Sequence, residues 1–308
     1  MVRSSSAPLY PEDFEEIRRV LNQHAGLWFS NELRPAIERR LRERLAAVRL
    51  DNFIEYRRYL NENPEEIEAA VEVCTINETY AFRGTRQLTA FRDVLLPRLA
   101  PASRSAVGRG TRERLVIWSA GCATGEEAYT LGAIVLASGW FPRERVHIFG
   151  TDISRRCLAV ARRGVYSNSS FRGDELRECD RYFVKLPDGG RVVSEDLRAI
   201  CHFRHANLLG PNLGGFIDVV FCRNVLIHMD EGARRRVVLS FYDRLSPGGY
   251  LVLGHSESLL NEDTPFEVLE LPDEIVYQKP DIGSGGSRPA TADPSAADKS
   301  SRSKGPPR

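Results

Sequence analysis

Residues 116–129 read Val-Ile-Trp-Ser-Ala-Gly-Cys-Ala-Thr-Gly-Glu-Glu-Ala-Tyr, and this stretch decides the fold of the 308-residue chain. Its apolar start predicts a strand, Gly121 and Gly125 predict a loop, and Glu126 predicts the start of a helix. Glycines at the carboxyl end of a strand let the backbone pass close beneath a nucleoside. The stretch therefore predicts an α/β fold that binds a nucleoside-type cofactor.

Short apolar runs followed by loops and helical stretches recur further along the chain. They are residues 147–149, 218–221 and 250–253, the last of which follows a Pro-Gly-Gly turn. Strands that alternate with helices predict a parallel sheet covered on both faces. Residues 182–204 hold three short apolar runs around a Pro-Asp-Gly-Gly turn, and they predict a small β-insert with a hairpin.

The two ends of the chain differ from this middle part. Residues 10 to about 75 have helical apolar periodicity and no strand signal. The last residues contain almost no large apolar side chain, so they cannot offset the entropy of becoming ordered. We therefore expect a helical domain over 1–75, an α/β domain over 76–280 with the β-insert at about 180–204, and a disordered tail over 281–308.

Composition excludes several classes of protein. The net charge of +1, with charges of both signs, gives no reason to expect nucleic acid or a membrane surface as a partner. No run approaches the roughly 20 apolar residues of a membrane-spanning helix. The six cysteines form no Cys-x-x-Cys pair, so we expect reduced thiols and no metal site. These features predict a cytoplasmic protein without membrane insertion, and a monomer is the default expectation.

Two carboxylates, Glu126 and Glu127, mark the start of the helix after the glycine loop. A dinucleotide site would use this helix N-terminus to bind a pyrophosphate, which the carboxylates would repel. A cationic cofactor such as S-adenosylmethionine has no such conflict. The alternative is that the two acids only complement the helix dipole.

Asp152 stands at the end of the next predicted strand, where an acid can bind two ribose hydroxyls. Its distance from the glycine loop exceeds the usual interval of about 20 residues, because a long helix intervenes. Alternatively, Asp152 caps the following helix together with Ser154.

Four segments in order also resemble one family, the chemotaxis receptor methyltransferases of the CheR type. They are Thr75-Ile-Asn-Glu-Thr-Tyr-Ala-Phe-Arg83, Trp118-Ser-Ala-Gly-Cys-Ala-Thr-Gly-Glu-Glu127, Phe221-Cys-Arg-Asn-Val-Leu-Ile227 and Gly254-His-Ser-Glu257. The resemblance runs from about residue 10 to 280. It implies an all-α N-terminal domain followed by a Rossmann-like class I methyltransferase domain with an inserted antiparallel β-subdomain. The implied reaction transfers a methyl group from S-adenosylmethionine to receptor glutamates, which yields glutamyl methyl esters and S-adenosylhomocysteine.

The resemblance also implies roles for individual residues. Those that would contact the cofactor are Asn77, Thr79, Arg83, Glu127, Asp152, Asn207 and Leu208, and Arg223 and Asn224 would line the same cleft. Arg83 would also orient the substrate carboxylate, since a guanidinium fork suits that group; a surface salt bridge is the alternative. Asn207 would read the adenine edge, although without the family a plain turn residue is favoured.

One position departs from the family pattern. His228 stands where the family usually carries a tyrosine whose hydroxyl lies near the methyl-transfer site. Histidine can donate a hydrogen bond but titrates near pH 6.5, so we expect lower or pH-dependent activity. Alternatively, His228 only packs beside the cleft. It is also the residue that favours a second function, a cofactor-binding regulatory module with weak or lost transfer.

The predicted partner is the cytoplasmic helical domain of methyl-accepting chemoreceptors. In a helical projection of residues 33–49, basic side chains oppose the apolar stripe: Arg39, Arg42 and Arg49, with Arg34 at the margin. Such a face would speed encounter with acidic receptor helices more than it would tighten binding. Glu38 and Glu43 dilute the charge, so a solvated face is the alternative. The short turn at 185–191 favours an enzyme that needs no receptor-tail peptide.

Overall fold

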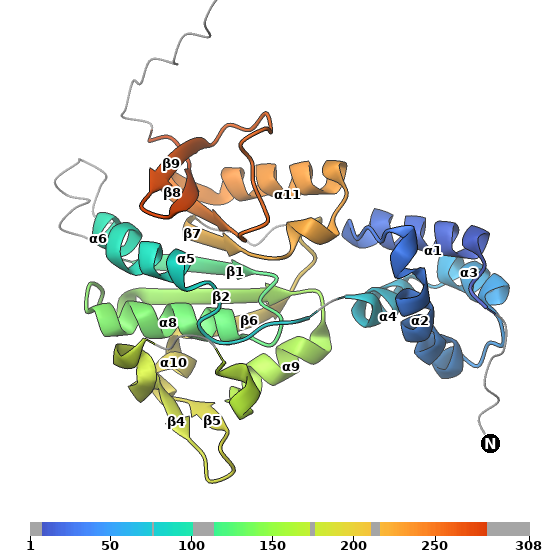
Figure 1. Ribbon diagram of the computed structural model, residues 1–308, viewed down its shortest axis with the longest axis horizontal. Coiled ribbons are helices and arrows are strands. Elements are labelled where there is room, and N and C mark those ends of the chain that lie inside the picture. Colours follow the sequence, from blue (N-terminus) through green and yellow to red (C-terminus); the bar gives the residue numbers. More distant parts are fainter. Residues whose placement is uncertain (1–7, 76, 101–113, 173–175, 211–215, 282–308) are drawn as a thin grey trace, which may run out of the picture.

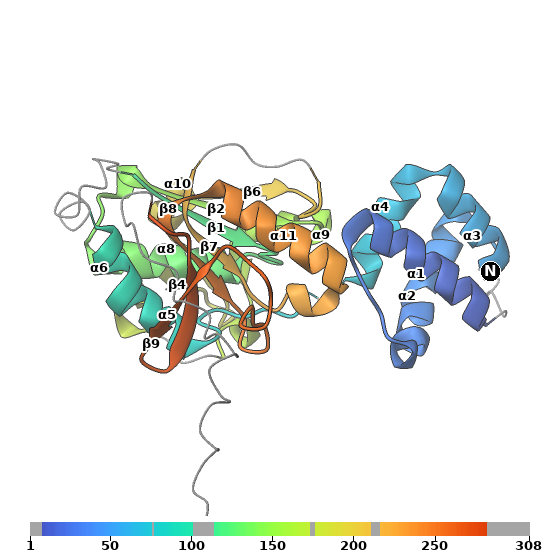
Figure 2. The ribbon, with the colours of Figure 1, turned by 90° about the horizontal axis from the view of Figure 1, so that it is seen from above.

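The computed structural model describes residues 8–75, 77–100, 114–172, 176–210 and 216–281. In these ranges, a bundle of helices lies against one end of a larger α/β unit (Figure 1), and the view from above separates the same two parts (Figure 2). The tail predicted from residue 281 lies, from residue 282 on, outside the described residues. No helix of the described ranges has both the length and the apolar character needed to cross a membrane.

The bundle contains α1 (Pro11–Ala25), α2 (Arg34–Val48), α3 (Phe53–Glu62) and α4 (Pro64–Cys74). Its helices begin at recognisable signals: prolines open α1 and α4, and the Asn52 side chain caps α3 by accepting a hydrogen bond from Glu55 N. Apolar stripes meet in a core that includes Phe14, Leu41 and Tyr56. The predicted absence of strands in this part agrees with the four helices.

The α/β unit is built on a seven-stranded sheet in the described part of the chain. Its strands are β1 (Leu115–Ala120), β2 (Val146–Asp152), β6 (Cys201–His205), β7 (Ile217–Cys222), β8 (Leu245–Leu253), β9 (Glu267–Leu271) and β10 (Glu274–Gln278), in the spatial order β6-β2-β1-β7-β8-β10-β9. The first five in space are parallel, whereas β10 runs antiparallel to β8 and β9. The predicted Pro-Gly-Gly turn is part of β8, which is a continuous strand with a register shift opposite β7.

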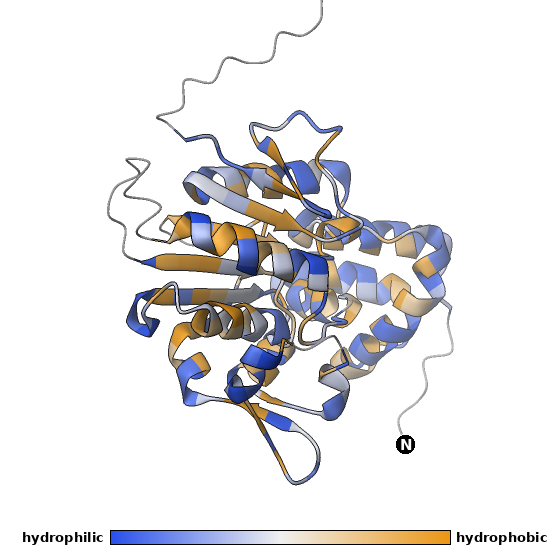
Figure 3. Cartoon of the chain, turned by 60° about the vertical axis from the view of Figure 1, so that its left-hand side comes forward, coloured by the Kyte–Doolittle hydropathy of each residue, from blue (hydrophilic) through white to orange (hydrophobic). Residues whose placement is uncertain are grey.

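Helices cover both faces of the sheet. They are α5 (Thr85–Ala90), a π-turn (Phe91–Leu95), α6 (Leu96–Leu99), α8 (Glu126–Ser138), α9 (Arg155–Arg163), α10 (Glu195–Ile200) and α11 (Glu231–Arg244). Short 3-10 turns lie at Asn31–Leu33, Arg143–Arg145, Asn168–Ser170, Arg177–Tyr182 and Leu226–His228. Successive strand residues face opposite sides: Phe221 packs in the core with Phe91 and α8, whereas Val220 packs with Phe241 of α11. In Figure 3, apolar colour accordingly concentrates on the strands and inner helix faces.

The β-insert contains two of its three predicted strands, around Phe183 and Val192, and differs from the prediction in the third. A separate antiparallel sheet joins β3 (Val165–Tyr166), β5 (Arg191–Val193) and β4 (Phe183–Lys185). The assignment of His202 and Phe203 to this insert is wrong, because both lie in β6 at the edge of the main sheet. Phe203 packs over Gly150, where an added Cβ would come within 2.6 Å of the Phe203 ring. A glycine distant in sequence therefore leaves the space that Phe203 needs in β6.

Candidate functional site

A cleft opens at the carboxyl ends of β1, β2 and β7, where the order of strands reverses. Open α/β sheets bind ligands at this switch point. The cleft contains about 1030 Å³ of empty space, a volume that includes open solvent at its mouth. Its walls come from the α/β unit, the segment after α4, and the helical bundle.

All ten residues predicted as cofactor-binding or catalytic line this one cleft. They are Asn77, Thr79, Arg83, Glu127, Asp152, Asn207, Leu208, Arg223, Asn224 and His228. The fold thus brings together residues separated by as much as half the chain.

The glycine loop after β1 follows a tight path that other residues could not adopt. Gly121 has φ +76°, and an added Cβ would lie 2.4 Å from Cγ2 of Val225 on the facing loop. The backbone N–H groups of Gly121 and Cys122 donate to the Thr151 carbonyl oxygen at 2.8 and 2.9 Å. Ala123 also has positive φ, +45°, a conformation that costs energy for a residue with a Cβ and is often found at functional sites.

Asp152 is buried at the end of β2 and is held from both sides. Its Oδ2 accepts a hydrogen bond from Ala123 N, and its Oδ1 accepts one from Ser154 N, both at 2.8 Å. The residue that caps α9 is Ser154, whose hydroxyl oxygen accepts from Cys157 N. Burial raises the pKa of the Asp152 carboxyl above its usual value. Each carboxylate oxygen retains acceptor capacity, so Asp152 suits the hydroxyls of a ribose.

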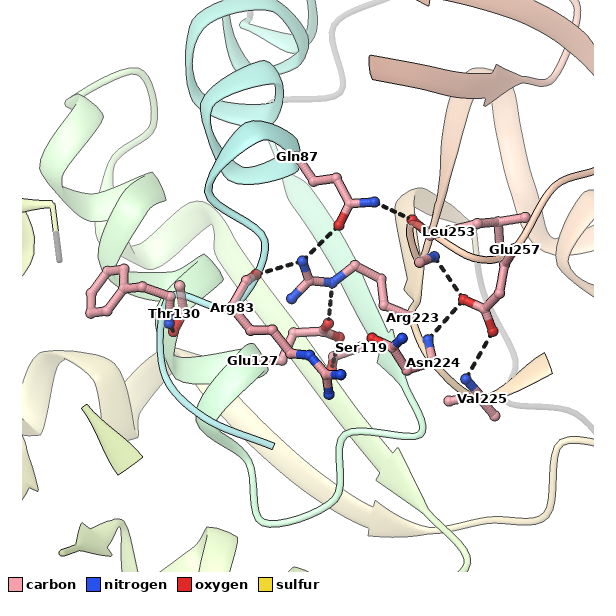
Figure 4. Close-up of polar contacts among 12 residues, drawn as sticks. Arg83, Gln87, Ser119, Glu127, Thr130, Arg223, Asn224, Val225, Leu253 and Glu257 are labelled. Carbon is pink, nitrogen blue, oxygen red and sulfur yellow. Dashed lines mark hydrogen bonds and ion pairs between the residues drawn. The ribbon is translucent and has the colours of Figure 1, made fainter. Parts of the chain in front are cut away.

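Glu127 belongs to a buried polar network that also contains Arg223 (Figure 4). Its two oxygens accept hydrogen bonds from Ser119 Oγ and Arg223 Nε, both at 2.7 Å. The Arg223 Nη1 donates onward to the Arg83 carbonyl oxygen at 2.6 Å and to Gln87 Oε1 at 2.9 Å. Arg223 therefore fixes Glu127 and the segment that carries Arg83, in addition to lining the cleft.

Glu126 does not share the position of Glu127. It is 3% exposed and accepts hydrogen bonds from the hydroxyls of Thr124 and Ser170 at 2.6 and 3.1 Å. Burial raises the pKa of its carboxyl. Of the two carboxylates used in the cofactor argument, only Glu127 lines the cleft.

The segment after α4 forms the rim of the cleft. Arg83 is half-buried, its Nη1 donates to the Glu78 carbonyl oxygen at 2.9 Å, and its guanidinium lies 5.6 Å from the Tyr80 ring centroid. The neighbouring Phe82 is buried at φ +59°, and its N–H donates to Thr130 Oγ1. The buried Phe82 anchors the rim, so Arg83 stays at the cleft while no carboxylate contacts its guanidinium among the hydrogen bonds described.

Asn207 has a structural role that sequence reasoning considered only as an alternative. Its Nδ2 donates to the His24 carbonyl oxygen at the end of α1, at 2.6 Å, and its Oδ1 accepts from Leu209 N at 3.0 Å. The side chain therefore shapes a turn and joins the helical bundle to the α/β unit. The adjacent Leu208 is half-buried in the cleft wall.

His228 is half-buried, and burial lowers the pKa of its imidazole although the charge of Glu257 acts in the opposite direction. Its carbonyl oxygen accepts a hydrogen bond from Trp28 N, and Leu27 and Met229 form a bridge beside it. Sequence reasoning missed this wall, to which Leu27 and Phe29 of the bundle contribute. The signal was present: an apolar run directly after Gly26, in a connection between two helices.

The side chains that line the cleft fit a cationic nucleoside. Asp152 offers acceptors for ribose hydroxyls, Glu127 contributes a carboxylate that is also paired with Arg223, and Gly121 lets the backbone approach closely. Leu27, Phe29 and Leu208 add apolar surface. The residues present therefore suit S-adenosylmethionine.

The strand order and this cleft define a class I S-adenosylmethionine-dependent methyltransferase domain, preceded by an all-α domain. Residues 77–275 match the family described as "CheR methyltransferase, SAM binding domain", and residues 12–75 match "CheR methyltransferase, all-alpha domain". The chain belongs to the CheR methyltransferase family.

Two similar proteins are named for different processes, chemotaxis and biofilm formation. "Chemotaxis protein methyltransferase 2" of Vibrio cholerae serotype O1 is 33% identical over 88% of this chain and 94% of its own length. "Probable biofilm formation methyltransferase WspC" of Pseudomonas aeruginosa is 32% identical over 89% of this chain and 64% of its own length. A solved structure of the glycopeptide N-methyltransferase MtfA with (S)-adenosyl-L-methionine is 19% identical, with 58% and 64% of the two chains covered and a TM-score of 0.32.

Proposed function

We propose that the protein transfers the methyl group of S-adenosylmethionine to glutamate side chains of chemoreceptors. The observation that carries the proposal is the placement of Arg83 at the rim of a cleft whose inner wall holds Glu127 and Asp152. The inner acids suit a cationic cofactor, and the rim cation suits an anionic substrate. The relatives named as chemotaxis methyltransferases support the same substrate.

The chemistry needs orientation more than proton transfer. A glutamate side chain has a reference pKa of about 4.3, so at neutral pH it is already an ionised nucleophile. S-adenosylmethionine supplies an electrophilic methyl group on a positively charged sulfur. The carboxylate oxygen forms the new C–O bond while the C–S bond breaks, which leaves a glutamyl methyl ester and neutral S-adenosylhomocysteine.

The residues of the cleft have separate tasks in this proposal. Asp152 holds ribose hydroxyls, Glu127 faces the positive end of the cofactor, and Arg83 orients the attacking carboxylate. Leu27 and Phe29 of the bundle help to exclude water, which strengthens these electrostatic interactions. An arginine that already donates to a carbonyl at 2.9 Å keeps further N–H groups for the substrate.

The arginines proposed for receptor binding on α2 and directly after it differ in exposure. Arg39 and Arg49 are exposed, whereas Arg34 is half-buried and the half-buried Arg42 forms an ion pair with Glu38 at 2.5 Å. We place the contact with the cytoplasmic helices of the receptor at Arg39 and Arg49. The proposal assumes a monomer that acts in the cytoplasm, where those receptor helices lie.

The test is transfer of labelled methyl from S-adenosylmethionine to membranes that contain the organism's own chemoreceptors. We expect base-labile label on the receptor, and loss of most of it in Arg83→Ala. The matched control is Arg86→Ala, which removes an exposed arginine of α5 outside the cleft lining. Normal cofactor binding without transfer to any receptor would contradict the proposal and favour the regulatory module. His228→Tyr would then be the first variant to test for restored transfer.

A further inference from the structure

A single carboxylate, that of Glu257, binds a row of backbone N–H groups beside the cleft (Figure 4). Its Oε1 accepts from Val225, Leu226 and Ile227 at 2.9, 2.7 and 3.3 Å. Its Oε2 accepts from Asn224 and Gly254, both at 2.7 Å. Successive N–H groups that point to one centre form a nest, which is an anion-binding concavity. Here the chain fills the nest with its own side chain.

The loop over residues 224–228 depends on this anion for its shape. Asn224 has φ +59°, a left-handed conformation that a residue with a Cβ adopts only when its surroundings impose it. Gly254 leaves the space for the carboxylate, since an added Cβ would lie 2.4 Å from Glu257 Oε2 and 2.8 Å from Asn224 N. Without the carboxylate, consecutive N–H groups would lose their acceptor while the left-handed turn remained unfavourable.

The same loop forms part of the cleft wall, and it carries His228, which the family resemblance implies to lie near the methyl-transfer site. Asn224, Val225 and His228 line the cleft, and Val225 packs against Gly121 of the glycine loop. Glu257 itself does not line the cleft. A shift of the loop by about 1 Å would misplace the groups around the methyl acceptor, and misplacement on that scale can cost about 100-fold in rate.

We propose that Glu257 is a positioning residue for methyl transfer: it occupies the backbone nest at 224–227 and thereby holds Asn224 and His228 at the reaction end of the cleft. The part of this inference that concerns turnover rests on the proposed function.

The test uses Glu257→Gln, Glu257→Asp and Glu257→Ala with Glu267→Gln as control, because Glu267 is an exposed carboxylate on β9. In Glu257→Gln, an amide NH₂ replaces one accepting oxygen and faces N–H donors. We expect kcat to fall about 100-fold with the affinity for S-adenosylhomocysteine changed by no more than about threefold. Amide hydrogen exchange at 224–227 should accelerate while α11 keeps its protection. Glu257→Asp, which keeps the charge but is shorter, should fall between Glu257→Gln and the native protein.

Chemical rescue separates an anion site from a mere packing role. In Glu257→Ala, sodium acetate should restore both exchange protection and turnover in a saturable manner, and sodium chloride at equal ionic strength should restore less. Unchanged exchange at 224–227 in Glu257→Gln, or equal losses of kcat and cofactor affinity, would overturn the inference. If the native protein methylates no receptor, the proposed function fails, whereas exchange and its rescue by acetate still decide the role of Glu257.

Discussion

The backbone N–H of Trp28 donates a hydrogen bond to the carbonyl oxygen of His228 at 2.8 Å, across the boundary between the helical bundle and the α/β unit. Beside it, Asn22 Nδ2 donates to Asp230 Oδ2 at 2.5 Å. On the other side of the cleft, Glu72 Oε1 accepts from Ser154 Oγ at 2.9 Å. The bundle therefore contacts both the loop that carries His228 and the turn that follows Asp152.

Replacing Gly26 by alanine should loosen this attachment. Gly26 has φ +71°, and a Cβ there would lie 2.7 Å from Ala233 Cβ in α11. The matched control is Gly139→Ala, which has φ +69° but no atom within 4 Å of the added Cβ. By denaturant unfolding we expect a loss of about 1 kcal/mol for Gly139→Ala and about 2–4 kcal/mol for Gly26→Ala. Binding of S-adenosylhomocysteine should weaken only in Gly26→Ala; equal effects of the two variants would contradict the attachment.

Asp152→Asn should weaken binding of S-adenosylhomocysteine roughly 10- to 100-fold, as loss of a charged hydrogen bond worth about 1.5–3 kcal/mol implies. Calorimetric titration measures this, with Asp263→Asn as control because that side chain is 98% exposed. Burial raises the Asp152 pKa, so affinity should fall as pH drops through that raised pKa. If Asp152→Asn binds S-adenosylhomocysteine as tightly as the native protein does, the Asp152 carboxylate does not contribute to cofactor binding.

Arg223 and Glu127 should show strong coupling in a double-mutant cycle. Their side chains are 5% and 11% exposed, so Arg223→Met leaves a buried carboxylate unpaired. We expect this variant to lose about 3–5 kcal/mol of unfolding free energy. Adding Glu127→Gln to Arg223→Met should recover part of the loss, because the uncompensated charge is then gone. Additive losses in the cycle would show that the pair does not act as a unit.

His228 should make methyl transfer sensitive to acid. Burial lowers its pKa below the usual value of about 6.5, so the imidazole is neutral at neutral pH and becomes charged only below that value. The added positive charge would oppose a cationic cofactor, and activity should fall as pH drops through the lowered pKa. His228→Tyr should lack this acid limb, whereas His255→Tyr, at an exposed histidine outside the cleft, should retain it. An unchanged rate and pH profile in His228→Tyr would leave His228 as a packing residue.

Arg39→Glu should reduce kcat/KM for receptor by about tenfold at low salt and leave kcat unchanged. The difference should shrink at 0.5 M salt because exposed charges are then screened over about 4–5 Å. Arg58→Glu, an equivalent change at an exposed position of α3, is the control. A reduction that persists at high salt would indicate a direct short-range contact in place of steering.

Local sequence was enough to predict the fold class and most of its elements. The stretch over residues 116–129 predicted a strand, a glycine loop and a helix, and these are β1, the Gly121 loop and α8. Such signals are local because apolar periodicity, glycine and capping residues act within one element. The resemblance to the CheR family added most of the residues that meet in the cleft, such as Arg83, Asn207 and Arg223.

The long-range contacts were decided only by the tertiary structure. His202 and Phe203 fit a hairpin equally well in sequence, and the choice of the main sheet depends on Gly150, which lies under the Phe203 ring. The second role of Asn207, the wall formed by Leu27, and four of the five N–H groups held by Glu257 likewise depend on partners far away in the chain. The type of a residue determines which hydrogen bonds it can make, but only folding determines which donors and acceptors lie within about 3 Å of it.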